Sequence, residues 1–183
     1  MRIEQTPLKD CFIIHEKVHG DARGYFIETF NQRDFTAASG LDIQFVQDNQ
    51  SRSSKGVLRG LHMQKGSSAQ AKLVRVLAGS VLDVAVDLRK GSPSFGQHFT
   101  IELTAENHKQ FFVPAGFAHG FVVLSESATF FYKVDKFYEP GNEVGIMYND
   151  TDLKIDWKLA DNELILSDKD KVLGSFAEYA ASL

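Results

Sequence analysis

The sequence predicts an all-β protein, an antiparallel sandwich or barrel with few and short helices. Apolar residues recur at every second position over short stretches, which is the pattern of half-buried strands. Phenylalanine, at 15 of 183 residues, and valine are abundant, and both favour pleated surfaces. Only Gln32–Ala38 and Ser175–Ser182 have helical character, so helices cannot cover both faces of a parallel sheet. Closely spaced strands joined by short turns therefore predict two sheets that bury each other.

Val81–Arg89 is the clearest strand, because apolar and polar side chains alternate along it. It follows Lys72–Leu77, and a Gly-Ser dipeptide between the two runs predicts a hairpin. In that hairpin Lys72 would lie opposite Asp87 and share a face with Asp83. Lys72 is then either one member of a cross-strand ion pair or a positioned cation in a pocket.

Eight further stretches have strand character, with turn residues such as Gly20-Asp21, Ser53-Ser54-Lys55-Gly56 and Gly91-Ser92-Pro93 between them. The stretches are Cys11–His15, Tyr25–Phe30, Ile43–Asn49, Val57–Gln64, Gln97–Leu103, Gln110–Val113, His119–Leu124 and Ala128–Phe137. The chain contains neither an internal repeat nor a low-complexity tract. It predicts one domain over residues 1–183, with a helical tail from about residue 171.

Composition restricts the class of protein. With 43% hydrophobic and 24% charged residues, no membrane-length apolar run and no signal-peptide pattern, the chain is expected to be soluble and cytoplasmic. The single cysteine, Cys11, excludes an intrachain disulfide and a thiolate metal cluster. A net charge of −4 without a dense Lys/Arg block gives no field for a nucleic-acid backbone, and neither nucleic acid nor membrane is expected as a partner.

Several known motifs are absent from the sequence. It contains no phosphate-binding loop, no dinucleotide fingerprint, no zincin helix and no serine-hydrolase elbow. What remains is a set of polar residues in otherwise apolar strands, so these residues are the candidates for chemistry.

The first candidates lie on Val57–Gln64, which places Arg59 three residues before His62. In a regular strand these side chains point to opposite faces, unless Gly60 marks a bulge. One histidine fixes no chemistry, and the spacing alone slightly favours a satisfied core histidine over a functional one.

A second histidine, His119, lies between an alanine and a glycine at a strand start, where small residues allow the close approach of a ligand or another backbone. A hairpin turn centred on Glu126-Ser127 would set Phe121 opposite Tyr132 and place His119 on the same face as Tyr132. The histidine and the tyrosine are then either core filler or the two titratable ends of a ligand pocket.

Five polar side chains lie on predicted strands that would line the interior: Arg59, His62, Lys72, His119 and Tyr132. Burying each without a partner would cost about 2–7 kcal/mol, so a polar, ligand-filled interior explains them better than a purely structural one. A metal site is disfavoured, because Met63 and Gln64 follow His62 and no His-x-His pair occurs. We therefore expect no metal and no cofactor.

Eight segments, in one order within residues 3–170, are more specific together than any single motif. They are Gly20-Asp-Ala-Arg23-Gly, Phe45-Val-Gln47-Asp-Asn49, Val57-Leu-Arg59-Gly-Leu-His62, Ala71-Lys72-Leu-Val-Arg, Asp83-Val-Ala-Val-Asp87, Pro114-Ala-Gly-Phe-Ala-His119-Gly-Phe, Phe131-Tyr132-Lys and Leu166-Ser-Asp-Lys169-Asp170. In this order they resemble the dTDP-4-dehydrorhamnose 3,5-epimerase family. The resemblance implies a cupin-type jelly-roll β-sandwich that is metal-free and forms a homodimer.

The resemblance also implies an isomerase of dTDP-L-rhamnose biosynthesis, a pathway that supplies carbohydrates such as lipopolysaccharide. Its reaction would epimerise C3 and C5 of dTDP-4-dehydro-6-deoxy-D-glucose to give dTDP-4-dehydro-L-rhamnose. A relative that acts at one carbon or moves the ketone between C3 and C4 is the first alternative. A non-catalytic sugar-binding cupin is the second, and a metal-dependent cupin is a distant third.

Residue by residue, the resemblance implies that His62 is the general base, Asp170 the carboxylate that orients it, and Tyr132 the proton donor on the opposite face of the sugar. Lys72, helped by Arg59, would stabilise the enolate oxygen at C4. The implied substrate contacts are Arg23, Phe26, Glu28, Gln47, Asp48, Asn49, Arg59, Lys72, His119, Tyr138, Glu143 and Lys169. Arg23 would reach across the dimer. Two features depart from the family pattern, namely Met63 in place of an aromatic residue and the tail beyond Asp170.

Overall fold

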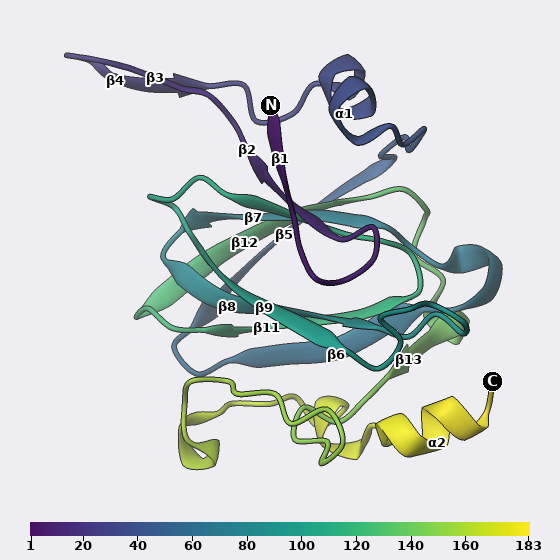
Figure 1. Cartoon of the computed structure of the whole chain (residues 1–183). Coiled ribbons are helices and arrows are strands. Elements are labelled where there is room, and N and C mark those ends of the chain that lie inside the picture. Colours follow the sequence, from purple (N-terminus) through teal and green to yellow (C-terminus); the bar gives the residue numbers. More distant parts are fainter.

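The computed structural model describes residues 1–183 and contains two antiparallel sheets stacked face to face (Figure 1). The six-stranded sheet has the order β1-β2-β10-β7-β12-β5, and the five-stranded sheet has the order β13-β6-β11-β8-β9. The remaining strands, β3 and β4, form a separate two-stranded ribbon. The predicted all-β sandwich with few short helices is confirmed.

The strands are β1 (Arg2–Gln5), β2 (Phe12–His15), β3 (Val18–Asp21), β4 (Gly24–Ile27), β5 (Gln47–Ser54), β6 (Leu58–Gln64), β7 (Lys72–Ala78), β8 (Ser80–Asp87), β9 (His98–Thr104), β10 (Gln110–Val113), β11 (Phe117–Val123), β12 (Ser127–Val134) and β13 (Glu143–Gly145). The helices are α1 (Gln32–Ser39) and α2 (Phe176–Ala181), and the 3₁₀ turns are η1 (Gly66–Ser68), η2 (Pro140–Asn142), η3 (Asp161–Glu163) and η4 (Asp170–Val172).

The two helices begin where the sequence supplies caps. The Asn31 side chain accepts hydrogen bonds from the first backbone N–H groups of α1, and the helix ends at Gly40, whose left-handed φ of 71° needs a residue without Cβ. In α2, Ser175 and Glu178 form a capping box. Both helices agree with the predicted segments to within one residue at each end.

The polar strand β5 differs most from its prediction. It was expected over Ile43–Asn49, yet it runs over Gln47–Ser54 and includes two serines expected in a turn. Every residue of β5 is paired with β12, and β5 has no neighbour on its other side. An edge strand with one solvated face tolerates polar residues of low strand propensity, so the apolar pattern alone does not locate it. Strands β1, β3 and β13 were also not predicted.

Both predicted hairpins are wrong. Strand β7 pairs with β10 and β12, whereas β8 pairs with β9 and β11 in the other sheet. Lys72 is consequently opposite Val113 and Val134 rather than Asp87. The short link at Gly79 is a crossing between sheets, and a Cβ there would lie 2.1 Å from the carbonyl oxygen of Ser127.

The second expected hairpin fails for the same reason. Strands β11 and β12 lie in different sheets, so Phe121 and Tyr132 are not cross-strand neighbours. Instead Phe121 stacks across the interior on Phe130, with ring centroids 4.1 Å apart. A short polar turn can join two sheets as well as two paired strands, and alternation does not distinguish the two cases.

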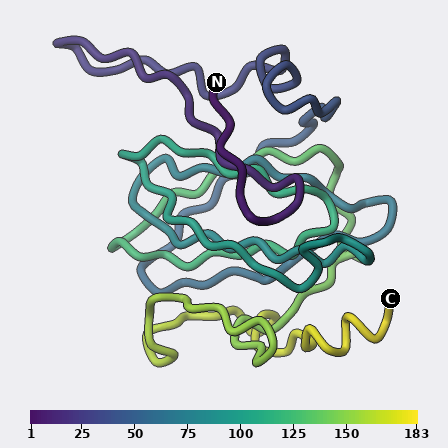
Figure 2. The backbone as a smooth tube through the Cα atoms, viewed as in Figure 1, coloured from purple at the N-terminus to yellow at the C-terminus, as the bar shows by residue number.

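Three apolar clusters hold the layers together. The largest contains Phe111, Phe117, Phe121 and Phe130 and lies between the sheets. A second covers the outer face of the five-stranded sheet with residues that follow β13, including Trp157. This returning chain runs along the lower sheet in Figures 1 and 2. A third cluster packs α1 against the six-stranded sheet.

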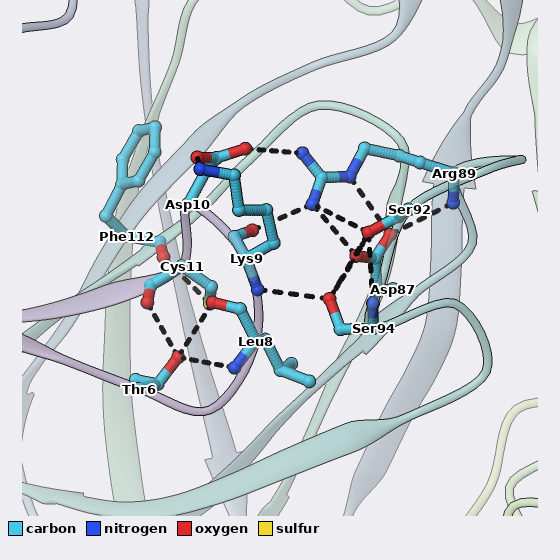
Figure 3. A network of polar contacts seen from close by, with 10 residues as sticks. All are labelled: Thr6, Leu8, Lys9, Asp10, Cys11, Asp87, Arg89, Ser92, Ser94 and Phe112. Atoms are coloured by element: carbon cyan, nitrogen blue, oxygen red, sulfur yellow. Dashed lines mark hydrogen bonds and ion pairs between the residues drawn. The ribbon is translucent and has the colours of Figure 1, made fainter.

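A polar network surrounds Asp87 and Arg89 (Figure 3). The Arg89 guanidinium donates to both carboxylate oxygens of Asp87 at 3.0 and 2.8 Å and to Asp10 at 2.9 Å. Asp87 also accepts hydrogen bonds from the hydroxyls of Ser92 and Ser94. Burial opposes ionisation of Asp87, but these bonds outweigh burial and lower its pKa. The network joins β8, the following loop and the N-terminal turn.

Removing this guanidinium tests how much the network stabilises the fold. We expect Arg89→Met to lower the free energy of unfolding by about 3 kcal/mol, because it leaves the buried Asp87 carboxylate without its cation. Urea unfolding measures the change.

Arg33→Met is the control, because Arg33 is paired with Asp34 on the surface, and it should cost less than about 0.5 kcal/mol. The deficit of Arg89→Met should shrink as the pH falls below 3.8, where unfolded Asp87 is protonated. Equal unfolding energies for Arg89→Met and the wild type at pH 7 would contradict the role of the network.

Candidate active site

A cavity of about 630 Å³ lies between the two sheets. Eight of the predicted site residues line it: Asn49, Arg59, His62, Lys72, His119, Tyr132, Lys169 and Asp170. They come from both sheets and from the chain that follows the last strand. Arg59, His62, Lys72, His119 and Tyr132 are the polar residues expected to line the interior from the strand pattern, and the other three followed only from the family resemblance.

A bulge in β6 brings two of these side chains to the cavity. The register with β11 shifts between the partners of His62 and Arg59, so that Gly60 and Leu61 together face Gly120. Gly60 has a φ of 122°, and a Cβ at this position would lie 2.5 Å from the Cα of Gly120. The two backbones can approach only because both residues are glycines. The sequence left open whether Gly60 marks a bulge; the register shift shows that it does, and the bulge places Arg59 and His62 in one cavity.

The His62 imidazole is bound to a buried carboxylate. Its Nε2 lies 2.5 Å from Oδ1 of Asp170, whose residue is only 3% exposed. Burial lowers the pKa of His62, Asp170 acts to raise it, and Lys169 and Lys72 act to lower it. When Nε2–H donates to Asp170, Nδ1 carries a lone pair and can accept a proton.

The segment that carries Asp170 is anchored beside the start of β6. Ile165 accepts a hydrogen bond from the backbone of Leu58 at 3.0 Å and donates one to the carbonyl of Gly56 at 2.8 Å. Gly56 has a φ of 81°, and a Cβ there would collide with the carbonyl of Glu163. This short parallel bridge fixes the chain five residues before the carboxylate.

A second imidazole–carboxylate pair lies on the same sheet. His119 Nε2 is 2.9 and 3.1 Å from the two oxygens of Asp83, and both residues are buried. Burial lowers the pKa of Lys72 to about 8, and the negative charge of Asp83 partly opposes this shift. Lys72 thus stays mainly protonated at pH 7 but is close to its titration range.

Tyr132 lies on the opposite wall from His62. It belongs to β12 of the six-stranded sheet, whereas His62 belongs to β6 of the five-stranded sheet. Burial raises the pKa of Tyr132, and the positive charge of Arg59 acts in the other direction. The phenol is therefore protonated at neutral pH and can donate. Arg59 is itself held by the hydroxyl of Ser53, which accepts from its Nε and Nη2.

Two more predicted residues, Gln47 and Glu143, contact the lining without belonging to it, and a third, Tyr138, contacts Glu143. Gln47 donates to the Asn49 side chain at 2.8 Å. Glu143 forms an ion pair with Lys169 and accepts a hydrogen bond from the Tyr138 hydroxyl at 3.0 Å. The ion pair joins β13 to the segment before Asp170.

The other four predicted residues do not line this cavity. Arg23 and Phe26 lie on the β3–β4 ribbon, which projects from the body of the molecule in Figure 1, and they are 90% (side chain) and 68% exposed. Glu28 accepts a hydrogen bond from Asn31, and Asp48 pairs with Lys133. No residue of the ribbon lines the cavity of its own chain.

Sequence reasoning missed several lining residues and one buried partner. The missed lining includes Phe121, Phe130 and Ser167, and the missed partner is Asp83 as the carboxylate of His119. The phenylalanines have no signal that separates them from core residues. Ser167 lies inside one of the segments that carry the resemblance and its contact with Asp170 is local, but its position at the cavity depends on the pairing of this segment with a distant strand. No group of three His, Cys, Asp or Glu side chains is placed to hold a metal ion.

Known proteins are similar to this chain in both sequence and fold. The family model described as dTDP-4-dehydrorhamnose 3,5-epimerase matches residues 5–178. The dTDP-4-dehydrorhamnose 3,5-epimerase of Pseudomonas aeruginosa is 53% identical, with 97% of each chain covered. The crystal structure of the Elizabethkingia anophelis enzyme of the same name has 56% identity and a TM-score of 0.94, with 97% of each chain covered. A dTDP-6-deoxy-D-glucose-3,5-epimerase from Legionella pneumophila, solved with dTDP-4-keto-L-rhamnose, has 48% identity and a TM-score of 0.92, covering 97% of this chain and 96% of that one.

Proposed function

The chain belongs to the dTDP-4-dehydrorhamnose 3,5-epimerase family, and we propose that its reaction takes place between His62 and Tyr132 in the cavity between the sheets. The enzyme is an isomerase that converts dTDP-4-dehydro-6-deoxy-D-glucose to dTDP-4-dehydro-L-rhamnose by epimerisation at C3 and C5. The observation that supports the residue assignment best is the contact of His62 with buried Asp170, opposite a protonated phenol.

His62 is proposed as the general base. The protons at C3 and C5 are acidic because each is adjacent to the C4 ketone, and a neutral imidazole can remove them near neutral pH. Asp170 fixes the tautomer and stabilises the imidazolium that forms. Burial holds the pKa of His62 low, so the ring is neutral and ready to accept a proton.

Lys72 and Arg59 are proposed to stabilise the enolate oxygen at C4. A cation that already points into the cavity favours the transition state, in which negative charge develops on that oxygen. His119, held by Asp83, also lines this cavity, on the wall formed by the five-stranded sheet. Asn49 and Lys169 line the same cavity and remain for the diphosphate and neighbouring groups.

Inversion requires a proton from the other side of the sugar ring. Tyr132 lies on the wall opposite His62 and carries a proton at neutral pH, so it can protonate the enolate on the face that the base does not reach. One residue on each wall thus accounts for both halves of an epimerisation.

We also propose that the enzyme works as a homodimer in which Arg23 and Phe26 enter the partner's site. The β3–β4 ribbon presents exposed aromatic side chains and does not reach the cavity of its own chain. A second copy of the chain related by a two-fold axis can receive the ribbon.

None of the helices is long and apolar enough to cross a bilayer. The cytoplasmic location stays a prediction of the sequence.

Two substitutions should separate proton removal from inversion. In heavy water with dTDP-4-dehydro-6-deoxyglucose, His62→Asn should abolish both deuterium incorporation and product. Tyr132→Phe should still incorporate deuterium from the base side while inversion fails. NMR of C3 and C5 measures both events. Asp168→Asn is the control, because this carboxylate is fully exposed and pairs with Lys171. Loss of exchange in Tyr132→Phe as complete as in His62→Asn would refute the assignment of the two walls.

The pH profile of kcat/KM should be bell-shaped. Activity should fall below an acidic limit under pH 6.5, because protonated His62 cannot act as a base and its pKa is lowered. It should fall again above about pH 8, because Lys72 then loses its charge. Lys72→Arg should be slower but should lose the basic limb, since arginine stays protonated. A basic limb unchanged in Lys72→Arg would contradict the role of Lys72.

Subunit mixing tests the shared site. Arg23→Ala and His62→Asn dimers should each be nearly inactive, but a mixed dimer contains one site with both native residues. After subunit exchange at equal amounts, about a quarter of the sites should be active. Steady-state turnover before and after mixing measures this. Full activity of the Arg23→Ala protein alone would remove the proposed sharing.

A further inference from the structure

A serine hydroxyl lies on the far side of the His62–Asp170 pair. Ser167 Oγ donates to Oδ2 of Asp170 at 2.9 Å, which is the carboxylate oxygen that does not contact His62. The backbone N–H of Asp170 donates back to Ser167 Oγ at 3.2 Å and to the Ser167 carbonyl at 3.1 Å. The serine thus fixes both the backbone and the side chain of the carboxylate.

The buried position of Asp170 makes this hydroxyl important. An ionised carboxylate with little access to water needs donors on both oxygens, because each unpaired oxygen destabilises the charge. His62 serves one oxygen and Ser167 the other. A donor that binds the charged form favours it and restricts the rotation of the carboxylate.

We propose that Ser167 is a positioning residue for proton removal, which holds the Asp170 carboxylate in the orientation that aims Oδ1 at Nε2 of His62. This inference rests on the proposed function, in which His62 is the base. Ser167 acts through Asp170 and does not contact the reacting carbon. The base is then supported by a chain of two hydrogen bonds that links a hydroxyl, a carboxylate and an imidazole. These groups come from two distant parts of the chain.

The position of Ser167 at the cavity allows a competing role, direct contact with the substrate. The residue lines the cavity and is itself exposed at its wall, so its hydroxyl could instead bind the substrate directly. The two roles predict different kinetics. A substrate contact raises KM or keeps its effect without Asp170, whereas a positioning residue lowers kcat and has no effect once Asp170 is neutral.

The first measurement compares two substitutions at one position. Ser167→Ala should lower kcat about tenfold with KM changed less than about twofold, the size expected when a hydrogen bond to a charged group is lost. Ser167→Thr should restore kcat, because it keeps the hydroxyl. Thermal unfolding of each variant identifies any loss of fold. Wild-type kcat in folded Ser167→Ala would overturn the inference.

The acidic limb of kcat/KM gives a second readout. Besides Asp170, the charged groups that act on His62 are Lys169, which is paired with Glu143, and Lys72. Without the serine hydroxyl the imidazole–carboxylate pair takes up a proton more readily, so the limb should move to higher pH in Ser167→Ala. In Asp170→Asn the limb should move to lower pH, because the charge that supports the imidazolium is gone. A merely structural serine would leave the limb unmoved, and that result would also overturn the inference.

A double substitution distinguishes failure of this inference from failure of the proposed function. In the Asp170→Asn background, Ser167→Ala should change kcat by less than about twofold, since the group through which it acts is already neutral. A further tenfold loss would show a direct substrate role and overturn the inference. His62→Asn is measured in the same assay. If His62→Asn keeps turnover, the proposed function fails. If it loses turnover while Ser167→Ala does not, only the serine inference fails.

Discussion

The contact between His62 and Asp170 joins two parts of the chain that are 108 residues apart. His62 is placed by a bulged strand, and Asp170 is placed by a segment that first crosses the outer face of the five-stranded sheet. That crossing depends on Leu153 and Trp157, which are buried against the sheet, and on the indole N–H of Trp157, which donates to the carbonyl of Tyr148. The outer apolar layer is therefore a requirement of the chemistry, because without it the carboxylate would not reach the imidazole.

The charges in the cavity explain how one site binds an anion and also stabilises an enolate. Arg59, Lys72 and Lys169 bring positive charge to the lining, whereas the carboxylates of Asp83 and Asp170 are each tied to a histidine. The carboxylates thus orient imidazoles and form no ion pair with Arg59 or Lys72, which are available to a diphosphate and to the C4 oxygen, whereas Lys169 is paired with Glu143. Burial lowers the pKa of Lys72 to about 8, so Lys72 is mainly protonated at pH 7 and loses its charge a little above that pH.

The sequence supports prediction where the physical signal is local. Alternation located most strands, and the two segments of helical character became the two helices. Gly60 marked the one point of its strand where a bulge could bring Arg59 and His62 together. The signal fails where partners are chosen over long distances. Nothing local separates the link at Gly79 from a hairpin turn, and β5 carries too few apolar residues to be located. Asp170 followed only from family resemblance, since a carboxylate in a loop has no periodicity.

The failed hairpins explain why the fold suits an epimerase. If β11 had paired with β12, His119 and Tyr132 would share one sheet and face the substrate from the same side. The chain instead crosses to the other sheet between β7 and β8 and again between β11 and β12. These crossings place His62 and His119 on one wall and Lys72 and Tyr132 on the other. Inverting a carbon needs a group on each side of its plane. A sandwich in which the chain crosses between sheets at these links therefore supplies the two faces that the reaction requires.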